Sequence, residues 1–314
     1  MPEKVLIYSR FPKAQMVRFG ERFELLDTAG KRPNDVFAPE QLSGIHAVLT
    51  AGGTPFSAEA MDLMPKLGAI VCYGTGYDGV DLAAAAKRGI AVGHSPGANA
   101  ASVADIAVTL MLATTRRLLA ADDYVRSGNW SGLKPSPMMR PQAGMLGRKV
   151  GVYGMGEIGR KIAARVAGFE TEVGYFSRSR HDVPYQYFPT LEALAEWCSV
   201  LMIAVRAGAD TNHAVDAGIL KKLGKEGYVV NISRGSVIDE PALIAALTDQ
   251  TIAGAGLDVY AREPHAPDAL TALPNVVLSP HIGGHTLESH VAMQNCVIEN
   301  LEAYFAGKAL PYAV

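Results

Sequence analysis

The chain has 314 residues, a formal net charge of −2 and 49% hydrophobic residues. Its length exceeds the usual limit for one hydrophobic core, so two domains are expected. The near-neutral charge gives no electrostatic reason to expect a nucleic acid or an anionic membrane surface as partner, and no apolar run is long enough to span a bilayer. Three widely spaced cysteines argue against a disulfide framework or a zinc site, and the N-terminus lacks a signal-peptide pattern. These features favour a reducing cytoplasm.

In the first third of the chain, short apolar runs alternate with helical stretches, as in parallel α/β sheets. The expected strands are VLIYS (5–9), AVLTA (47–51), AIVCY (69–73) and IAVGH (90–94). Pro96 and Gly97 then break the rhythm, and a long helix is expected from about Ala100 to Arg117. The Gly- and Pro-rich stretch 128–148 predicts an extended loop or arm.

A second α/β series begins at Lys149. Its expected strands are VGVYG (150–154), TEVGYFS (171–177), VLMIAV (200–205), YVVNIS (228–233), AGAGLDVY (253–260) and VVLSP (276–280). A dinucleotide-binding domain has some six strands, and this series supplies that number by itself. An amphipathic helix from about Thr286 to Phe305 follows, and we expect it to pack back on the first domain. The predicted fold class is therefore α/β, with two Rossmann-like parallel-sheet domains.

A glycine pattern, Gly154-x-Gly156-x-x-Gly159, follows an apolar strand and opens a helix. In a dinucleotide-binding turn the first glycine allows a tight turn, the second admits the pyrophosphate, and the third lets helix and strand pack closely. The amides at the helix N-terminus would then bind the phosphates. A structural turn without a ligand is the alternative, because 32 glycines make accidental matches easy.

The end of the next strand is where an NAD site usually places Asp or Glu to bind the ribose hydroxyls. Ser177 stands there, and Arg178, Ser179 and Arg180 follow it. A carboxylate would repel a 2′-phosphate, whereas serine can donate a hydrogen bond to it and arginine can pair with it. The pocket therefore predicts NADP(H), with NAD(H) as the weaker alternative. A solvated basic loop without a ligand is the other interpretation.

Three polar residues, Arg234, Glu263 and His281, each come just after an expected strand, at the edge where open α/β sheets bind ligands. Hydride transfer to a 2-oxo acid needs a cation near the substrate carboxylate and carbonyl, and an acid that protonates the forming alkoxide. Arginine suits the first task because its guanidinium is permanently charged. Histidine suits the second because it titrates near neutrality, and a nearby carboxylate would keep it protonated. The alternative is that the arginine is a surface residue and the histidine a structural one.

Six sequence blocks in order resemble the D-isomer-specific 2-hydroxyacid dehydrogenase family over nearly the whole chain. They are GTGYDGVDLAAAAKRGIAV, PGANAASVADIAVTLMLATTRR, VGVYGMGEIG, NISRGSVIDEPALIAAL, AGLDVYAREP and SPHIGG. The serine at 177 resembles the NADPH-preferring glyoxylate and hydroxypyruvate reductase branch of that family. The resemblance implies an active-site cleft between a discontinuous substrate domain (1–98 plus 286–314) and a dinucleotide-binding domain (99–285). It also implies a homodimer formed through residues 100–148.

The resemblance assigns roles to single residues. Arg234 would hold the substrate, and Glu263 would support His281 as the acid/base. Asp258 would face the nicotinamide carboxamide. The residues expected at the substrate are Gly53, Tyr73, Gly74, Thr75 and Gly76, whose backbone amides around 73–76 would bind the carboxylate. The residues expected at the cofactor are Gly154, Met155, Gly156, Glu157, Ile158, Ser177, Arg178, Ser179, Arg180, Val205, Arg206, Thr211, Ile232, Ser233, Asp258, Gly283 and Gly284.

Two positions leave alternatives open. Arg206 stands where the family usually has proline, so it either adds a phosphate contact or is an exposed loop residue, and Thr211 is a further candidate for the same site. Trp130 either packs across the dimer or enters the neighbouring subunit's substrate pocket.

The predicted activity is NADPH-dependent reduction of small 2-oxo acids, glyoxylate and hydroxypyruvate first, to D-2-hydroxy acids, without a metal. One alternative is a broader reductase that acts on 2-ketogluconate or aryl pyruvates. Another is a cofactor-sensing binding protein, like the corepressors that share this fold. Formate oxidation is disfavoured because the family's formate enzymes pair the active-site histidine with glutamine, where this chain has Glu263.

Overall fold

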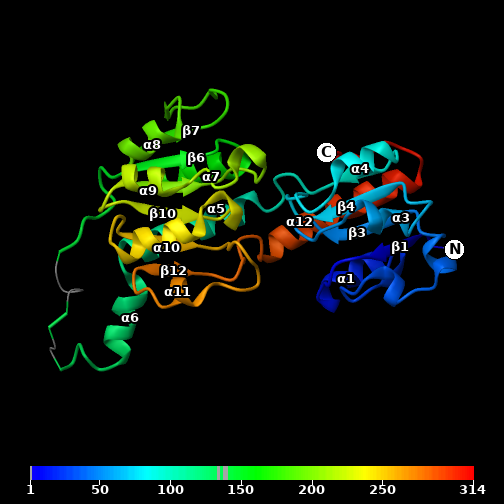
Figure 1. Cartoon of the computed structure of the whole chain (residues 1–314), viewed down its shortest axis with the longest axis horizontal. Helices are drawn as coiled ribbons and strands as arrows, with labels where there is room; N and C mark the ends of the chain where they lie inside the picture. Colours follow the sequence, from blue (N-terminus) through cyan, green and yellow to red (C-terminus); the bar gives the residue numbers. More distant parts are fainter. Residues whose placement is uncertain (1, 133–134, 137–140) are drawn as a thin grey trace. The chain divides into compact units, whose positions relative to one another are not determined.

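The computed structural model describes residues 2–132, 135–136 and 141–314, so part of the expected arm lies outside the described residues. The chain divides into two compact units, one formed by Met1–Asn99 with Gly284–Val314 and the other by Ala100–Gly283. Figure 1 shows the helices and strands of each unit. Within the described residues, no helix combines the length and the apolar character needed to cross a bilayer.

The first unit contains a parallel sheet with the strand order β2-β1-β3-β4-β5. These strands are β1 (Lys4–Ile7), β2 (Glu24–Asp27), β3 (Ala47–Ala51), β4 (Ala69–Tyr73) and β5 (Ala91–Gly93). The helices around the sheet are α1 (Lys13–Gly20), α2 (Pro39–Leu42), α3 (Ala58–Asp62), α4 (Leu82–Lys87) and α12 (Leu287–Phe305). Both faces of the sheet are covered, because side chains alternate along a strand and both alternating sets are apolar. In β1, Leu6 packs among residues of α2 and α3, whereas Val5 and Ile7 pack against α1 and α12.

The second unit contains a parallel sheet with the order β12-β11-β10-β9-β6-β7-β8. Its strands are β6 (Lys149–Tyr153), β7 (Glu172–Phe176), β8 (Gln186–Tyr187), β9 (Val200–Ile203), β10 (Tyr228–Asn231), β11 (Gly254–Leu257) and β12 (Val276–Leu278). Its helices are α5 (Ala100–Thr115), α6 (Leu118–Arg126), α7 (Glu157–Ala167), α8 (Leu191–Trp197), α9 (Ala217–Leu223), α10 (Glu240–Thr248) and α11 (Asp268–Thr271). The first strand in the sequence, β6, lies inside the sheet. β7 and β8 follow on one side of it, and β9, β10, β11 and β12 follow in order on the other side, which is the doubly wound Rossmann arrangement.

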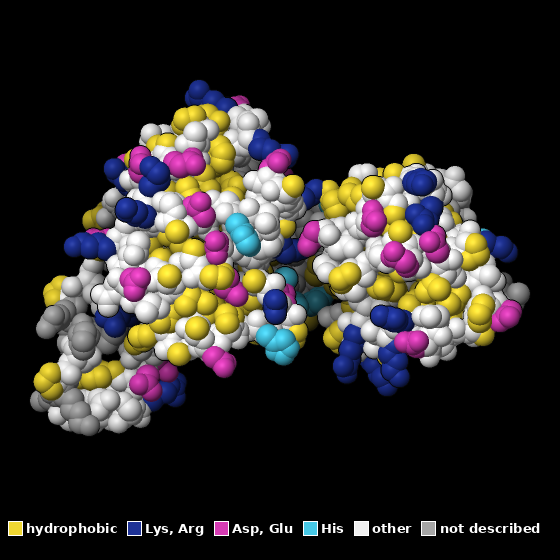
Figure 2. Space-filling model, viewed as in Figure 1, with side chains coloured by type: hydrophobic (Ala, Val, Ile, Leu, Met, Phe, Trp, Pro, Cys, Tyr) yellow, Lys and Arg dark blue, Asp and Glu magenta, His cyan; other side chains and the backbone are white. Residues whose placement is uncertain are grey.

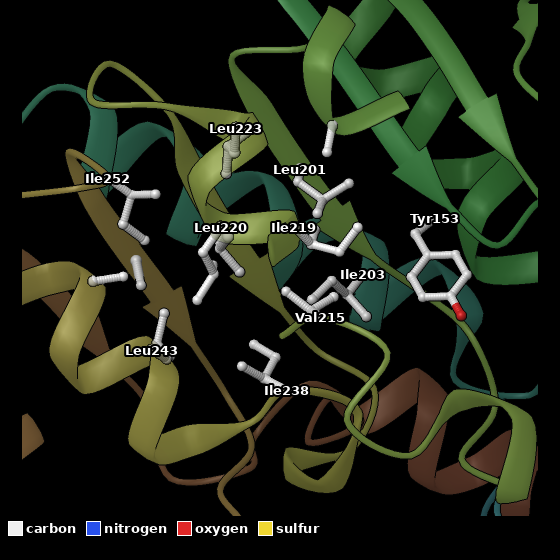
Figure 3. Packing of buried hydrophobic residues seen from close by; sticks show 14 of the residues in the cluster. Tyr153, Leu201, Ile203, Val215, Ile219, Leu220, Leu223, Ile238, Leu243 and Ile252 are labelled. Carbon is white, nitrogen blue, oxygen red and sulfur yellow. The ribbon is translucent and has the colours of Figure 1, made fainter. Parts of the chain in front are cut away.

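Two hydrophobic cores hold helices on the two faces of this second sheet. Leu201 and Ile203 of β9 pack with Ile219 and Leu220 of α9, and Figure 3 shows these side chains pointing toward one another. The intervening Met202 packs on the other face, among residues of α5 and α7. Burying one such side chain is worth about 1.5–3 kcal/mol. Because successive apolar side chains of β9 point to opposite faces, the strand holds helices on both faces of the sheet.

The predicted α/β fold class, with two Rossmann-like parallel-sheet units, is confirmed. Some elements differ from expectation. The strands β2 and β8 were not among those expected. The helix expected to reach Arg117 ends at Thr115, because Arg117 adopts a left-handed backbone conformation (φ 50°) through which a right-handed helix does not continue. A separate helix, α6, begins at the next residue.

Candidate active site

The glycine turn between β6 and α7 has the geometry of a dinucleotide cradle. Gly154 has φ +100°, a conformation that side-chain-bearing residues rarely adopt. A Cβ at Gly159 would lie 1.9 Å from the carbonyl oxygen of Gly154, so only glycine lets helix and turn approach this closely. A Cβ at Gly156, in contrast, would meet no atom within 4 Å. The residue at the N-cap of α7 thus faces open space, and the turn fits a pyrophosphate bound at the helix N-terminus.

The basic loop that follows β7 is exposed. Ser177 comes directly after the strand, and its hydroxyl donates to the carbonyl oxygen of Ser179 at 2.7 Å. The expected donation from Ser177 to a 2′-phosphate therefore requires the hydroxyl to rotate. Among the described residues, the side chains of Arg178 and Arg180 have no hydrogen-bond or ion-pair partner. Two unpaired guanidinium groups next to the glycine turn favour an anion at this position.

The loop after β9 contains the two weaker cofactor candidates. Thr211 donates from its hydroxyl to the carbonyl oxygens of Arg206 (2.8 Å) and Gly208 (3.2 Å), so its side chain closes its own loop. Arg206 is exposed. The roles of Arg206 and Thr211 at the cofactor stay predictions. Of the other predicted cofactor residues of this unit, Met155 lies in the glycine turn, and Glu157 and Ile158 begin α7. The rest lie in the loops that follow β9, β10 and β12; they are Val205, Ile232, Ser233 and Gly283.

His281 and Glu263 form a direct pair. The distance from Nδ1 of His281 to Oε2 of Glu263 is 2.6 Å, and the side chains are 46% and 34% exposed. The other carboxylate oxygen, Oε1, accepts from the backbone amide of Tyr260 at 3.2 Å. Both oxygens of Glu263 are therefore used, and the carboxylate is held in one orientation toward the imidazole.

The pKa of Glu263 is lowered from its ordinary value of 4.5. Burial raises this pKa, but the hydrogen bond and positive charge of His281, the amide of Tyr260 and the charge of Arg234 together outweigh it. An ionised carboxylate only accepts hydrogen bonds, so Nδ1 of His281 is the donor. Nε2 is then the nitrogen that can give a proton to a substrate. Because the pKa is lowered, the carboxylate adds to folding stability above pH 4.5, and this contribution is lost as the pH falls through the lowered value.

Arg234 lies in the loop after β10, which is packed against the loop that carries Glu263. A Cβ at Gly235 would lie 1.9 Å from the carbonyl carbon of Tyr260, so the two backbones touch. Nη1 of Arg234 donates to the carbonyl oxygen of Ser233 at 2.7 Å, and the side-chain amide of Asn231 donates to the carbonyl oxygen of Arg234 at 2.9 Å. These contacts fix the loop that carries Arg234, whose charge is one of the causes that lower the pKa of Glu263.

Asp258 braces the loop that carries His281. Its carboxylate is 1% exposed and accepts hydrogen bonds from the hydroxyl of Ser279 (2.6 Å) and the amides of Ile282 (2.9 Å) and Gly283 (2.8 Å). His281, between these anchors, has a left-handed backbone with φ 54°, which costs roughly 1–2 kcal/mol for a residue other than glycine. Sequence reasoning missed this positioning role. The sequence indicates this role only by placing an aspartate in the otherwise apolar stretch AGLDVY at the end of a strand. The expected contact of Asp258 with nicotinamide stays a prediction.

The residues expected at the substrate carboxylate belong to the first unit. Gly284, which was expected at the cofactor, also belongs to that unit. Gly74, directly after β4, has φ +108°. A Cβ at Gly52 would lie 1.8 Å from the carbonyl oxygen of Gly76, so the loop after β3 packs tightly on the loop after β4. A Cβ at Gly53 would meet no atom within 4 Å. The Tyr73 hydroxyl is 2.8 Å from Nδ1 of His290, and burial raises the pKa of Tyr73 to about 12.

The comparisons with known proteins identify the family. Residues 108–283 match the family described as D-isomer specific 2-hydroxyacid dehydrogenase, NAD binding domain. A 2-ketogluconate reductase from Gluconobacter oxydans is 42% identical over 267 residues, which is 85% of each chain. Glyoxylate/hydroxypyruvate reductase A of Arabidopsis thaliana is 38% identical over 291 residues, 92% of each chain.

A solved structure is similar over the whole length. It is the NADPH-dependent glyoxylate/hydroxypyruvate reductase of Sinorhizobium meliloti in complex with NADP and malonate, with a TM-score of 0.91 and 34% identity, covering 100% of this chain and 97% of that one. The fold, the glycine cradle and the Arg–Glu–His group define a nucleotide-dependent oxidoreductase. The chain belongs to the D-isomer-specific 2-hydroxyacid dehydrogenase family.

Proposed function

We propose that this chain is an NADPH-dependent reductase that converts small 2-oxo acids, glyoxylate and hydroxypyruvate first, to D-2-hydroxy acids. The observation that carries the cofactor choice is the end of β7, where Ser177 replaces an acidic residue and unpaired Arg178 and Arg180 follow. A relative named as a glyoxylate/hydroxypyruvate reductase supports the substrate class. A solved structure named as an NADPH-dependent glyoxylate/hydroxypyruvate reductase, in complex with NADP, supports the cofactor.

The proposed reaction uses the Arg–Glu–His group of the second unit. When bound, NADPH would supply the hydride that the carbonyl carbon of the substrate accepts. Nε2 of His281 gives a proton to the carbonyl oxygen, so the products are the D-2-hydroxy acid and NADP⁺. Glu263, ionised and 2.6 Å from Nδ1, stabilises the imidazolium before that transfer. Arg234 stabilises the negative charge that develops on the oxygen.

The backbone after β4 is the proposed site for the substrate carboxylate. Positive φ at Gly74 turns the chain, and consecutive amides in such a turn form an anion-binding concavity. The hydroxyl of Thr75 donates to the side-chain oxygen of Asn99 at 2.7 Å, which fixes this turn. Tyr73, whose hydroxyl is engaged by His290, contributes its backbone rather than its side chain.

A broader substrate range is the second candidate. A relative that is 42% identical is named as a 2-ketogluconate reductase. Gly53 leaves open space where a side chain would stand, so the loop after β3 sets no steric limit at that position. This candidate keeps the same chemistry and differs only in the length of the substrate accepted.

The test is a set of initial rates with NADPH or NADH against glyoxylate, hydroxypyruvate, 2-ketogluconate and phenylpyruvate. We expect the highest kcat/KM with NADPH and one of the two smallest acids. In the double variant Arg178→Ala/Arg180→Ala, kcat/KM with NADPH should fall roughly 10- to 100-fold while kcat/KM with NADH stays within about twofold.

A double variant with Lys221→Ala and Lys222→Ala removes the same charge from α9 and serves as the control, because the one ion pair it breaks, with Glu196, is on the surface. Equal losses with both cofactors in the arginine variant would contradict the cofactor choice. Fastest turnover of 2-ketogluconate or phenylpyruvate would select the broader reductase. Tight NADPH binding without turnover of any acid would favour the cofactor-sensing protein.

We also propose a homodimer formed through α6 and the segment after it. None of the residues of α6 is buried, and Leu118, Leu119 and Val125 are more than half exposed, as is Trp130 beyond the helix. Figure 2 shows hydrophobic side chains over this region. A cavity of about 560 Å³ lies between α6 and the amino-terminal ends of β10, β11 and β12, with Leu119 and Ile252 among its lining residues. A second copy would cover these apolar side chains.

The free thiols of Cys72, Cys198 and Cys296 support the cytoplasm as the location of the protein.

The mass in solution tests this interface. The protein should sediment as a dimer, and Leu119→Glu should shift it to a monomer, because the interface would have to bury an unpaired charge. Val17→Glu, which alters an equally exposed apolar residue of the first unit, should leave the dimer intact. A monomeric wild type would contradict the proposal.

A further inference from the structure

We infer that Arg160 of α7 is a third cation of the 2′-phosphate site, held in place by His181; this inference rests on the proposed NADPH preference. Neither residue belongs to the glycine turn or to the Ser177–Arg180 run. They come from two segments that are 21 positions apart in the sequence, and one contact joins them: Nη2 of Arg160 lies 3.1 Å from Nδ1 of His181.

The backbone brings the start of α7 and the end of β7 together. β6 and β7 are paired in parallel, with Tyr153 opposite Phe176. The amide of Gly154 donates to the carbonyl oxygen of Phe176 at 2.8 Å, so the glycine turn is hydrogen-bonded to the residue before Ser177. Figure 1 shows β6 and α7 next to the β7 end of the sheet. An arginine in the first turns of α7 can therefore reach the ribose end of a bound dinucleotide.

The loop after β7 is closed by a buried tyrosine. Tyr175 is fully buried, and its hydroxyl accepts from the amide of His181 at 2.8 Å and donates to the carbonyl oxygen of the same residue at 3.0 Å. The bond from Ser177 to Ser179 closes the loop a second time. Because the backbone of residues 177–181 is fixed at both ends, the cations on it are held in place before a ligand arrives.

The Arg160–His181 contact orients a charge without neutralising it. A guanidinium has no acceptor, so Nδ1 of His181 accepts and the imidazole hydrogen lies on Nε2. A carboxylate partner would have compensated the charge of Arg160; within the described residues its side chain contacts His181 and forms no ion pair. Arg160, Arg178 and Arg180 thus place three guanidinium groups around one short loop. Like charges repel one another, so this arrangement favours a dianion between them, and a 2′-phosphate supplies that charge.

The test measures equilibrium binding rather than turnover. Calorimetry with 2′,5′-ADP (adenosine 2′,5′-bisphosphate) and with 5′-AMP compares two ligands that differ only in the 2′-phosphate. We expect Arg160→Ala to weaken binding of 2′,5′-ADP roughly tenfold and to leave binding of 5′-AMP within about twofold. Lys161→Ala, the neighbouring residue on the same helix, is the matched control and should change neither affinity.

His181→Ala tests the positioning role. It should weaken binding of 2′,5′-ADP less than Arg160→Ala does, and the double variant should bind no more weakly than Arg160→Ala alone, because the histidine acts through the arginine. Additive losses would overturn the positioning role.

The outcomes separate this inference from the proposed function. A wild type that binds 2′,5′-ADP no more tightly than 5′-AMP would overturn the NADPH preference and this inference together. A selective wild type whose selectivity survives Arg160→Ala, but is lost in Arg178→Ala/Arg180→Ala, would overturn this inference alone. Equal weakening of both ligands by Arg160→Ala would also overturn it, since the arginine would then act on the shared part of the nucleotide.

Discussion

His281→Asn should lower kcat for 2-oxo acid reduction by about 10³-fold while NADPH still binds, because asparagine cannot give the proton that the forming alkoxide needs. Asparagine is the substitution of choice at this position. His281 has φ 54°, and asparagine tolerates the left-handed region better than most residues, so the loop keeps its backbone. The measurement is steady-state turnover together with NADPH binding followed by protein fluorescence.

A second histidine provides the matched control for this substitution. His213 is exposed, lies in the same unit and has a similar left-handed backbone, with φ 51°. His213→Asn therefore makes the same chemical change at the same kind of backbone position, at a histidine whose amide donates to the carbonyl oxygen of Ser236 and which, within the described part of the chain, forms no hydrogen bond with Glu263. It should retain activity within about twofold. Full activity in His281→Asn would remove His281 from the mechanism.

The strands and the glycine turn could be predicted because their signals are local. Each central strand is a short run of apolar residues, and both of its faces are buried, so the pattern survives in the sequence. The edge strand β2, with the sequence ELLD, has acidic residues at both ends and gives no such run. α6 could not be predicted from amphipathic burial, because it buries none of its residues within the unit. The break before it depends on the left-handed conformation of Arg117, which no sequence pattern requires.

The site was predictable as a set of residue types at strand ends, but not as a set of contacts. Glu263 and His281 could be paired from the chemistry that hydride transfer needs. The three bonds that Asp258 makes to the loop after β12 could not, because they depend on how that loop folds around a buried carboxylate. The contact between Arg160 and His181 joins α7 to the loop between β7 and β8, so it could be found only in the tertiary structure.

Glu263→Gln should lower kcat at neutral pH by about 10²-fold and should recover part of that loss in acid. The wild-type carboxylate accepts from two donors, Nδ1 of His281 and the amide of Tyr260. Glutamine has one acceptor oxygen and one NH₂ group, so one of those donors meets another donor. The substitution also removes the negative charge that stabilises the imidazolium. The measurement is the pH profile of kcat/KM for 2-oxo acid reduction.

The direction of the pH effect follows from the charge on Glu263. Its pKa is lowered, so the carboxylate is ionised across the neutral range. Reduction needs a proton on His281, and the negative charge of Glu263 stabilises the imidazolium that carries it. Without that charge, the activity of the variant should fall at a lower pH than the activity of the wild type. A variant with reduced activity but an unmoved profile would show that Glu263 only orients the ring. Glu263 could act by orienting the imidazole or by stabilising its positive charge, and at a single pH both roles give the same loss of activity in the variant. Only the pH profile of kcat/KM distinguishes the two roles.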